Sequence, residues 1–236
     1  MRTFEIEQKF VFNISLLACF RMNRGSPPFR TLCHQRTERF KDEYFDSSNK
    51  LSKNGIWIRK RNESWEAKHR QSGDYLRSSF HETTNVDEIK GLVATYGPAG
   101  QSIMPEANFG LNSICRYLTT RETFLADHQF SIMLDSTDFG HSVGEVELQT
   151  CEATTALADI DKFMQKYSWF FANKTPPKGK MTAYFELHGF PSEPRRSSPT
   201  PLRTFHFANA DVALTLEDLI SKAVKSIATQ AASVKI

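Results

Sequence analysis

Charged side chains near the N-terminus recur at every second position. Residues 3–10 read TFEIEQKF, so Glu5, Glu7 and Lys9 alternate with apolar and uncharged residues. Because successive side chains of a β-strand point to opposite faces, these three charges share one face of a predicted strand. A half-exposed structural strand has the same pattern. Paired carboxylates are also the ligands that Mg²⁺ and Mn²⁺ prefer, so both interpretations stay open on this segment alone.

The same spacing of charges recurs along the chain. Glu145 and Glu147 form a second carboxylate pair in GEVELQT (144–150). Further charged residues share strand faces with neighbours two or four positions away: Arg59 and Arg61 with Trp57, Glu66 with Lys68 and Arg70, Arg121 with Tyr117, Asp135 with Met133, and Lys180 with Tyr184. Seven such segments in one small domain indicate a charged sheet face with a function, rather than seven solvated strands.

Acids and bases on one face suit a polyphosphate bound together with metal ions. Guanidinium and ammonium groups bind phosphate oxygens, and carboxylates bind Mg²⁺ or Mn²⁺. One ion would polarise the phosphates and another would activate the attacking water. Phosphoryl transfer depends mainly on positioned positive charge. The hypothesis is therefore that Glu5 and Glu7 face the interior of a closed sheet as metal ligands.

Short strands joined by tight turns dominate the predicted secondary structure. Strands are expected at 3–10, 40–46, 55–61, 65–70, 76–82, 114–124, 130–139, 144–150 and 179–189. Helices are expected at 14–21, 85–97 and 152–170. This pattern predicts an α+β, mostly β domain, either a closed antiparallel barrel or a sandwich. In a closed barrel the polar face would line the interior and helices would cover the apolar face.

Composition limits the domain organisation. The chain has 236 residues, enough for one domain of about 190 residues and a tail. We expect the domain at 1–190 and a flexible linker rich in Pro, Ser and Arg at 191–210. A C-terminal helix is expected at 211–236. It would pack on the domain or bind a protein partner.

Several classes of protein are disfavoured. A net charge of +3 gives no reason to expect nucleic acid as a partner. The sequence has no apolar run of about 18 residues, so no membrane partner is expected. Its four cysteines form no C-x-x-C pair and indicate neither a zinc site nor a disulfide framework. We expect a cytoplasmic monomer.

Six segments, in order, resemble the CYTH superfamily, also called triphosphate tunnel metalloenzymes. They are EIEQK (5–9), DEYFD (42–46), WIRKR (57–61), WEAK (65–68), LDSTDFGHSVGEVE (134–147) and GKMTAY (179–184). The thiamine triphosphatases are the members that the chain resembles most. The resemblance covers residues 3 to about 190. It implies an eight-stranded antiparallel closed tunnel with flanking helices, which hydrolyses a triphosphate with Mg²⁺ or Mn²⁺.

The resemblance also implies roles for single residues. The implied metal ligands are Glu5, Glu7, Glu145 and Glu147, with Asp135 on the same face as Met133. The implied phosphate-binding residues are Lys9, Arg59, Arg61, Lys68, Arg121 and Lys180. Lys68 is also the candidate catalytic residue, which would position the attacking water. Trp57 stands where thiamine triphosphatases stack a Trp on thiamine, which favours thiamine triphosphate as the substrate and thiamine diphosphate and phosphate as the products.

Other functions remain open on the sequence. Met133 stands where animal members of the family have an additional Asp, so either a metal ligand is missing or Asp135 on the same face compensates for it. An inorganic triphosphatase or a broader nucleoside triphosphatase would use the same tunnel. A non-catalytic module that binds polyphosphate would keep the bases and lose the metal chemistry.

Overall fold

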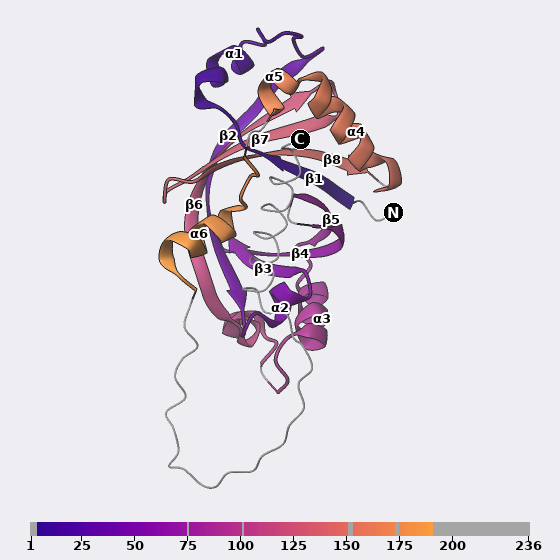
Figure 1. The fold of residues 1–236 in the computed structure, drawn as a ribbon. Helices are drawn as coiled ribbons and strands as arrows, with labels where there is room; N and C mark the ends of the chain where they lie inside the picture. Colours follow the sequence, from indigo (N-terminus) through magenta and orange to yellow (C-terminus); the bar gives the residue numbers. More distant parts are fainter. Residues whose placement is uncertain (1–3, 75, 101, 151–152, 173–174, 191–236) are drawn as a thin grey trace, which may run out of the picture. The chain divides into compact units, whose positions relative to one another are not determined.

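Eight antiparallel strands close into a ring in this protein (Figure 1). The structure is a computed structural model. It describes residues 4–74, 76–100, 102–150, 153–172 and 175–190, all of which lie in one unit, Met1–Pro191.

The order of the strands around the ring is β1-β5-β4-β3-β2-β6-β7-β8, and pairing of β1 with β8 closes it. The strands are β1 Phe4–Phe10, β2 Leu32–Asp46, β3 Ile56–Arg61, β4 Ser64–Gly73, β5 Arg77–Thr83, β6 Asn112–Ala126, β7 Phe130–Thr137 and β8 Ser142–Thr150. The longest pairing joins β2 to β6, two strands of 15 residues each. The predicted closed antiparallel tunnel is confirmed, and the alternative of a sandwich is excluded.

Short helices flank the ring. They are η1 Ile14–Leu16, α1 Leu17–Arg21, α2 Lys50–Lys53, α3 Val86–Tyr96, η2 Pro105–Gly110, α4 Ala153–Lys166, α5 Ser168–Phe171 and α6 Lys180–His188. Among the residues that the structure describes, no helix has the length and apolar character needed to span a membrane.

The apolar strand faces point outward and pack under the helices. One core joins Ile6, Phe10 and Val146 of the ring to residues of α1, α4 and α5, including Ile160 and Phe170. A second core covers the other side of the ring. It joins Phe45, Ile58 and Ala67 to Leu51 of α2 and Ile89 of α3. Because side chains alternate along a strand, this packing turns the charged face toward the interior.

The register of β1 and β8 brings the two predicted carboxylate pairs together where the ring closes. Glu7 lies opposite Glu147, and Lys9 lies opposite Glu145. One position further, Phe10 lies opposite Gly144 on the outward face. The acidic residues from both ends of the domain therefore share one wall of the tunnel.

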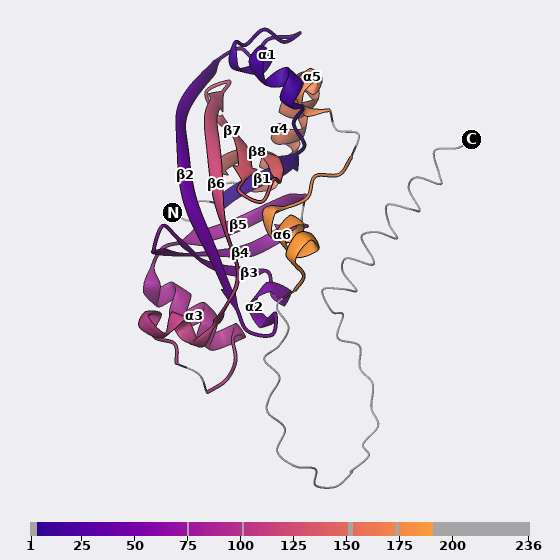
Figure 2. The ribbon, with the colours of Figure 1, turned by 90° about the vertical axis from the view of Figure 1, so that its left-hand side faces the viewer.

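The prediction of a last strand at residues 179–189 is wrong. Residues 179–189 form the helix α6, Lys180–His188, beside the ring rather than in it (Figure 2). Phe185, on the helix, packs into a third core with Tyr44 and Tyr117 of the strands. A nine-residue segment with alternating polarity is ambiguous between a strand and a helix, and tertiary packing decides. The predicted linker at 191–210 and helix at 211–236 lie outside the described residues.

Candidate active site

A cavity of about 340 Å³ runs inside the ring. Its wall contains all of the site residues predicted from the sequence except Asp135: Glu5, Glu7, Lys9, Trp57, Arg59, Arg61, Lys68, Arg121, Glu145, Glu147 and Lys180. These residues come from β1, β3, β4, β6, β8 and α6, so only the closed ring brings them together. Predicted residues from both ends of the domain thus meet in one cavity.

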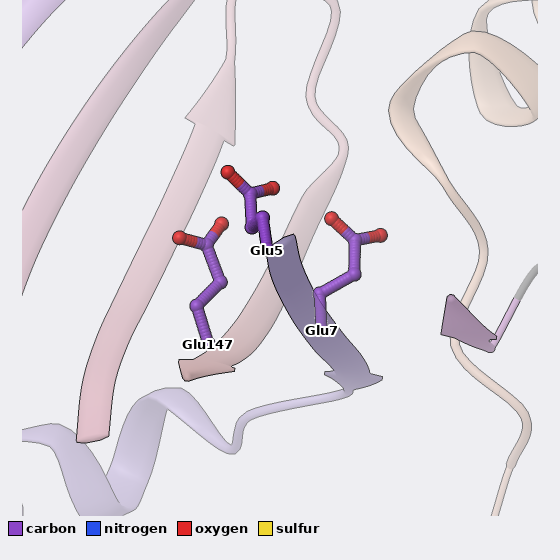
Figure 3. Close-up of side chains that lie close together, drawn as sticks. All are labelled: Glu5, Glu7 and Glu147. Carbon is purple, nitrogen blue, oxygen red and sulfur yellow. The ribbon is translucent and has the colours of Figure 1, made fainter. Parts of the chain in front are cut away.

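Three carboxylates gather at the junction of β1 and β8. Oxygens of Glu5, Glu7 and Glu147 all lie within 4.8 Å of one another (Figure 3). Burial raises the pKa of Glu5 to about 7, although the charge of Lys68 acts in the opposite direction. Burial and the nearby charge of Glu5 hold the pKa of Glu147 well above its usual value. Such a cluster of hard oxygen donors fits a divalent cation such as Mg²⁺.

Lys68 lies beside this cluster of three carboxylates. Its Nζ is 2.7 Å from Oε1 of Glu5 and 3.8 Å from Oε2 of Glu7, and it also forms an ion pair with Glu82. Burial lowers the pKa of Lys68, but the charges of Glu5, Glu7 and Glu82 outweigh burial and hold this pKa well above its usual value. Lys68 is therefore a permanent cation that donates hydrogen bonds, and it does not act as a general base.

Glu145 takes a different position from the three clustered carboxylates. It lies 3.6 Å from Nζ of Lys9 and 3.2 Å from Nη2 of Arg121. Burial raises the pKa of Glu145, yet Lys180, Lys9 and Arg121 outweigh it and hold the pKa well below the usual value. The structure thus places Glu145 among the bases, and its predicted role as a metal ligand stays a prediction.

Asp135 is fully buried and binds the two bases next to it. Arg121 donates hydrogen bonds of 2.7 and 2.8 Å to its two oxygens, and Lys180 forms a further ion pair with it. The pKa of Asp135 is lowered because these cations outweigh the effect of burial. Asp135 anchors the bases, whereas its predicted metal ligation is a separate role that these contacts do not test.

Other carboxylates hold the arginines of β3 in the same way. Arg61 donates two hydrogen bonds to Asp42, of 2.8 and 2.9 Å, in a bidentate pair. Arg59 donates to Glu66 at 2.8 Å and to the hydroxyl of Tyr44 at 3.2 Å. Each guanidinium is thereby fixed in orientation while it still lines the cavity.

Trp57, in the cavity wall, contacts Phe80 and Arg70. The ring of Phe80 meets the Trp57 ring edge-on, with centroids 5.7 Å apart. The guanidinium carbon of Arg70 lies 4.8 Å from the Trp57 ring centroid. Trp57 therefore lines the cavity, as predicted, but Arg70 stacks on it.

The cavity also contains residues that the predicted site omitted: Arg36, Tyr44, Arg70, Ser78, Phe80, Glu82, Tyr117, Met133, Gln149, Gly179, Met181 and Thr182. Arg70 had a usable signal, because it lies two positions from Lys68 on one strand. Glu82 had none, since its contact with Lys68 depends on the pairing of β4 with β5.

Comparison with known proteins gives a likeness in fold alone. No protein-family model and no curated protein matches the sequence. A solved structure from Pyrococcus horikoshii OT3 matches with a TM-score of 0.54 and 17% identity, covering 78% of this chain and 99% of that one. The match shows a shared fold, which agrees with the closed tunnel that the resemblance to the CYTH superfamily implied.

Two further solved structures share this tunnel fold. One, from Hippeastrum, is provisionally named an adenylyl cyclase and is described as having a dominant triphosphatase activity. It matches with a TM-score of 0.50 and 15% identity, and the match covers 78% of this chain and 96% of that chain. Another, from Vibrio parahaemolyticus, is provisionally named an adenylate cyclase and has a TM-score of 0.51 at 15% identity. Its match covers 78% of this chain and 99% of that chain.

Proposed function

We propose that this protein hydrolyses a triphosphate with the help of a divalent metal ion, Mg²⁺ by preference and Mn²⁺ as an alternative. The observation that carries the proposal is the meeting of three clustered carboxylates, Glu5, Glu7 and Glu147, with fixed bases in one cavity. A triphosphate brings negative charge for the bases and shares the metal with the carboxylates. The triphosphatase activity described for the Hippeastrum protein, which has the same fold, supports this reaction class.

The three clustered carboxylates would hold the ion. It would supply positive charge to the phosphate oxygens when the bond between the terminal phosphoryl group and the leaving diphosphate breaks. Arg59, Arg61 and Arg121 would bind the phosphates with guanidinium groups that carboxylates already orient. Pre-oriented donors stabilise the developing charge without reorganisation during the reaction.

Lys68 would complete the arrangement as a positioning cation. It lies between Glu5 and Glu82 and stays protonated, so it donates hydrogen bonds to a phosphate oxygen or to the attacking water. Because Lys68 carries no free electron pair, the proton of the water has to leave by another group or with the phosphate product.

Within this class the resemblance makes thiamine triphosphate one candidate substrate, with thiamine diphosphate and phosphate as the products. The resemblance and the presence of Trp57 in the cavity wall support this choice. Inorganic triphosphate and nucleoside triphosphates are the alternatives on the same cavity, and a binding module without turnover is the alternative outside enzymes.

Phosphate release tests the reaction directly. We would measure it with Mg²⁺ from thiamine triphosphate, inorganic triphosphate and ATP, for the wild type and for Glu147→Gln. The variant should lose on the order of 100-fold in kcat, because a ligand of the metal is gone. Glu43→Gln is the matched control, since Glu43 pairs with Arg116 and does not line the cavity. Release that is equal in wild type and Glu147→Gln would overturn the proposal, and binding of triphosphate without any release would establish the binding module.

A further inference from the structure

One basic residue of the cavity differs from all the others in its charge environment. Seven bases of the wall each have a carboxylate within 4.0 Å: Lys9, Arg36, Arg59, Arg61, Lys68, Arg121 and Lys180. Arg70 also lines the cavity, but it forms no ion pair with any residue that the structure describes. Asp74 and Glu7 act on it only from a longer distance.

Arg70 is half-buried and has no carboxylate of the described residues within ion-pair distance. Its Nε is buried and has no hydrogen-bond partner. Burial lowers the pKa of Arg70, an effect that Asp74 and Glu7 do not offset. A buried donor that lacks a partner is costly, and a charged donor more so. An anion that entered the cavity would remove this cost by accepting a hydrogen bond from Arg70.

Because Arg70 lies over the Trp57 ring, its position determines which part of a substrate can bind next to Trp57. A guanidinium 4.8 Å from the ring centroid is at cation–π distance, so the face of Trp57 that it covers already holds a positive charge. A cationic ring stacked on that face would displace Arg70 or lie against its unpaired charge. Repulsion between two positive charges is stronger in such a half-buried site than in bulk water.

We propose that Arg70 is a specificity-determining residue, which selects a phosphate group at the Trp57 part of the cavity and disfavours a cationic ring such as the thiazolium of thiamine. This inference rests on the proposed hydrolysis of a triphosphate, and it favours inorganic triphosphate over thiamine triphosphate as the substrate. Inorganic triphosphate, whose groups are all anionic, becomes a better substrate than thiamine triphosphate. Trp57 then serves to hold Arg70 in place.

The test compares two substrates across a small set of variants. We would measure kcat/KM with Mg²⁺ for inorganic triphosphate and for thiamine triphosphate in the wild type, Arg70→Gln, Arg70→Met and Arg70→Lys. The wild type should prefer inorganic triphosphate. The two neutral variants should shift the ratio of kcat/KM values about tenfold toward thiamine triphosphate, the effect of one lost charge-assisted hydrogen bond. Arg70→Lys should keep the preference of the wild type.

Arg116→Gln is the matched control. Arg116 is an exposed arginine on β6 that pairs with Glu43 and does not line the cavity, so its removal should leave the ratio unchanged. A ratio in Arg70→Gln and Arg70→Met within twofold of the wild-type ratio would overturn the assignment. So would a wild-type preference for thiamine triphosphate that these variants do not increase.

Calorimetric binding separates this inference from the proposed reaction. The same two triphosphates would be titrated into each protein without divalent metal, so that no hydrolysis occurs. A neutral variant should weaken binding of inorganic triphosphate more than binding of thiamine triphosphate. If no protein releases phosphate but this difference appears, the hydrolysis proposal fails and the role of Arg70 stands. If release occurs and the difference is absent, the role of Arg70 fails.

Discussion

Single residues in the cavity are distinguished by what compensates their charge. The carboxylates Asp42 and Asp135 are fixed by guanidinium groups, and their pKa values lie below the usual value. Glu5 and Glu147 lie close to each other and have raised pKa values. In Glu5 and Glu147 the effect of burial exceeds that of the neighbouring cations, so a bound metal ion can affect these two residues most.

The raised pKa of Glu5 predicts that metal affinity depends on pH. In the metal-free folded protein Glu5 keeps its proton up to a pKa of about 7, whereas in the unfolded chain it loses the proton at the ordinary pKa of 4.5. The stability that this proton gives the folded state is therefore complete below pH 4.5 and is lost as pH rises to about 7. Mg²⁺ must displace this proton below pH 7. The Kd for Mg²⁺ should therefore fall by up to about tenfold between pH 6 and pH 7. Above pH 7 the ionisation of Glu5 should change the Kd less.

Calorimetry in buffers of different ionisation enthalpy measures both the Kd and the number of protons released. Glu43→Gln, outside the cavity, should show the same pH dependence as the wild type. Hydrolysis should accordingly favour neutral to alkaline pH. An affinity for Mg²⁺ that does not change between pH 6 and pH 8, or an acid optimum of activity, would contradict the assignment of Glu5.

At the scale of elements, alternation of polarity predicted the strands well and one helix poorly. In β1 and β8 the charged residues at every second position identified both the strands and the face that lines the cavity. The same alternation in residues 179–189 predicted a strand, whereas that segment is α6. Lys180 still lines the cavity, because it lies at the start of α6 and reaches Asp135.

Strand β2 shows a second limit of sequence patterns. Residues 40–46 were expected, but the strand begins at Leu32. Its first half is mostly exposed and polar, so no burial pattern marks it in the sequence. Its partner β6 imposes the extended conformation there, through pairs such as Thr37 with Glu122. A partner strand 80 or more residues away leaves no local signal.

Closure of the ring depends on a glycine where β1 meets β8. A Cβ atom on Gly144 would lie 2.3–2.6 Å from the ring of Phe10. Phe10 has no exposed surface, and its ring packs edge-on against Phe171 with centroids 4.9 Å apart. Gly144→Ala should therefore lower the free energy of unfolding by about 1–3 kcal/mol, the usual cost of overpacking.

Urea denaturation measures this change as a lower midpoint at an unchanged m-value. Gly91→Ala is the matched control, because a Cβ at this exposed position of α3 meets no atom within 4 Å. The control should gain about 0.5–1 kcal/mol, since alanine favours a helix over glycine. A midpoint of Gly144→Ala at or above that of the wild type would show that β1 and β8 can separate without cost.

For the domain as a whole, the ring places more bases than acids around one cavity. The wall contains eight basic residues, Lys9, Arg36, Arg59, Arg61, Lys68, Arg70, Arg121 and Lys180, and five acidic ones, Glu5, Glu7, Glu82, Glu145 and Glu147. These residues attract a polyanion and its metal most strongly in the folded ring, where they lie around one cavity. In the unfolded chain they are far apart, spread along the sequence between residues 5 and 180. A ligand of this kind should therefore bind the folded state far better than the unfolded chain.

Ligand binding should consequently raise the melting temperature. A non-hydrolysable analogue of inorganic triphosphate with Mg²⁺ at 100 times its Kd adds about 2.7 kcal/mol to the free energy of unfolding. For a domain of this size, that increase corresponds to a shift of roughly 5–10 °C. Differential scanning calorimetry checks it, with sodium sulfate at equal ionic strength as the control for general anion effects. Glu147→Gln should show a smaller shift with Mg²⁺, because it lacks one carboxylate of the cluster. An equal shift with sulfate, or an undiminished one in Glu147→Gln, would mean that the stabilisation comes from surface charge and not from the closed cavity.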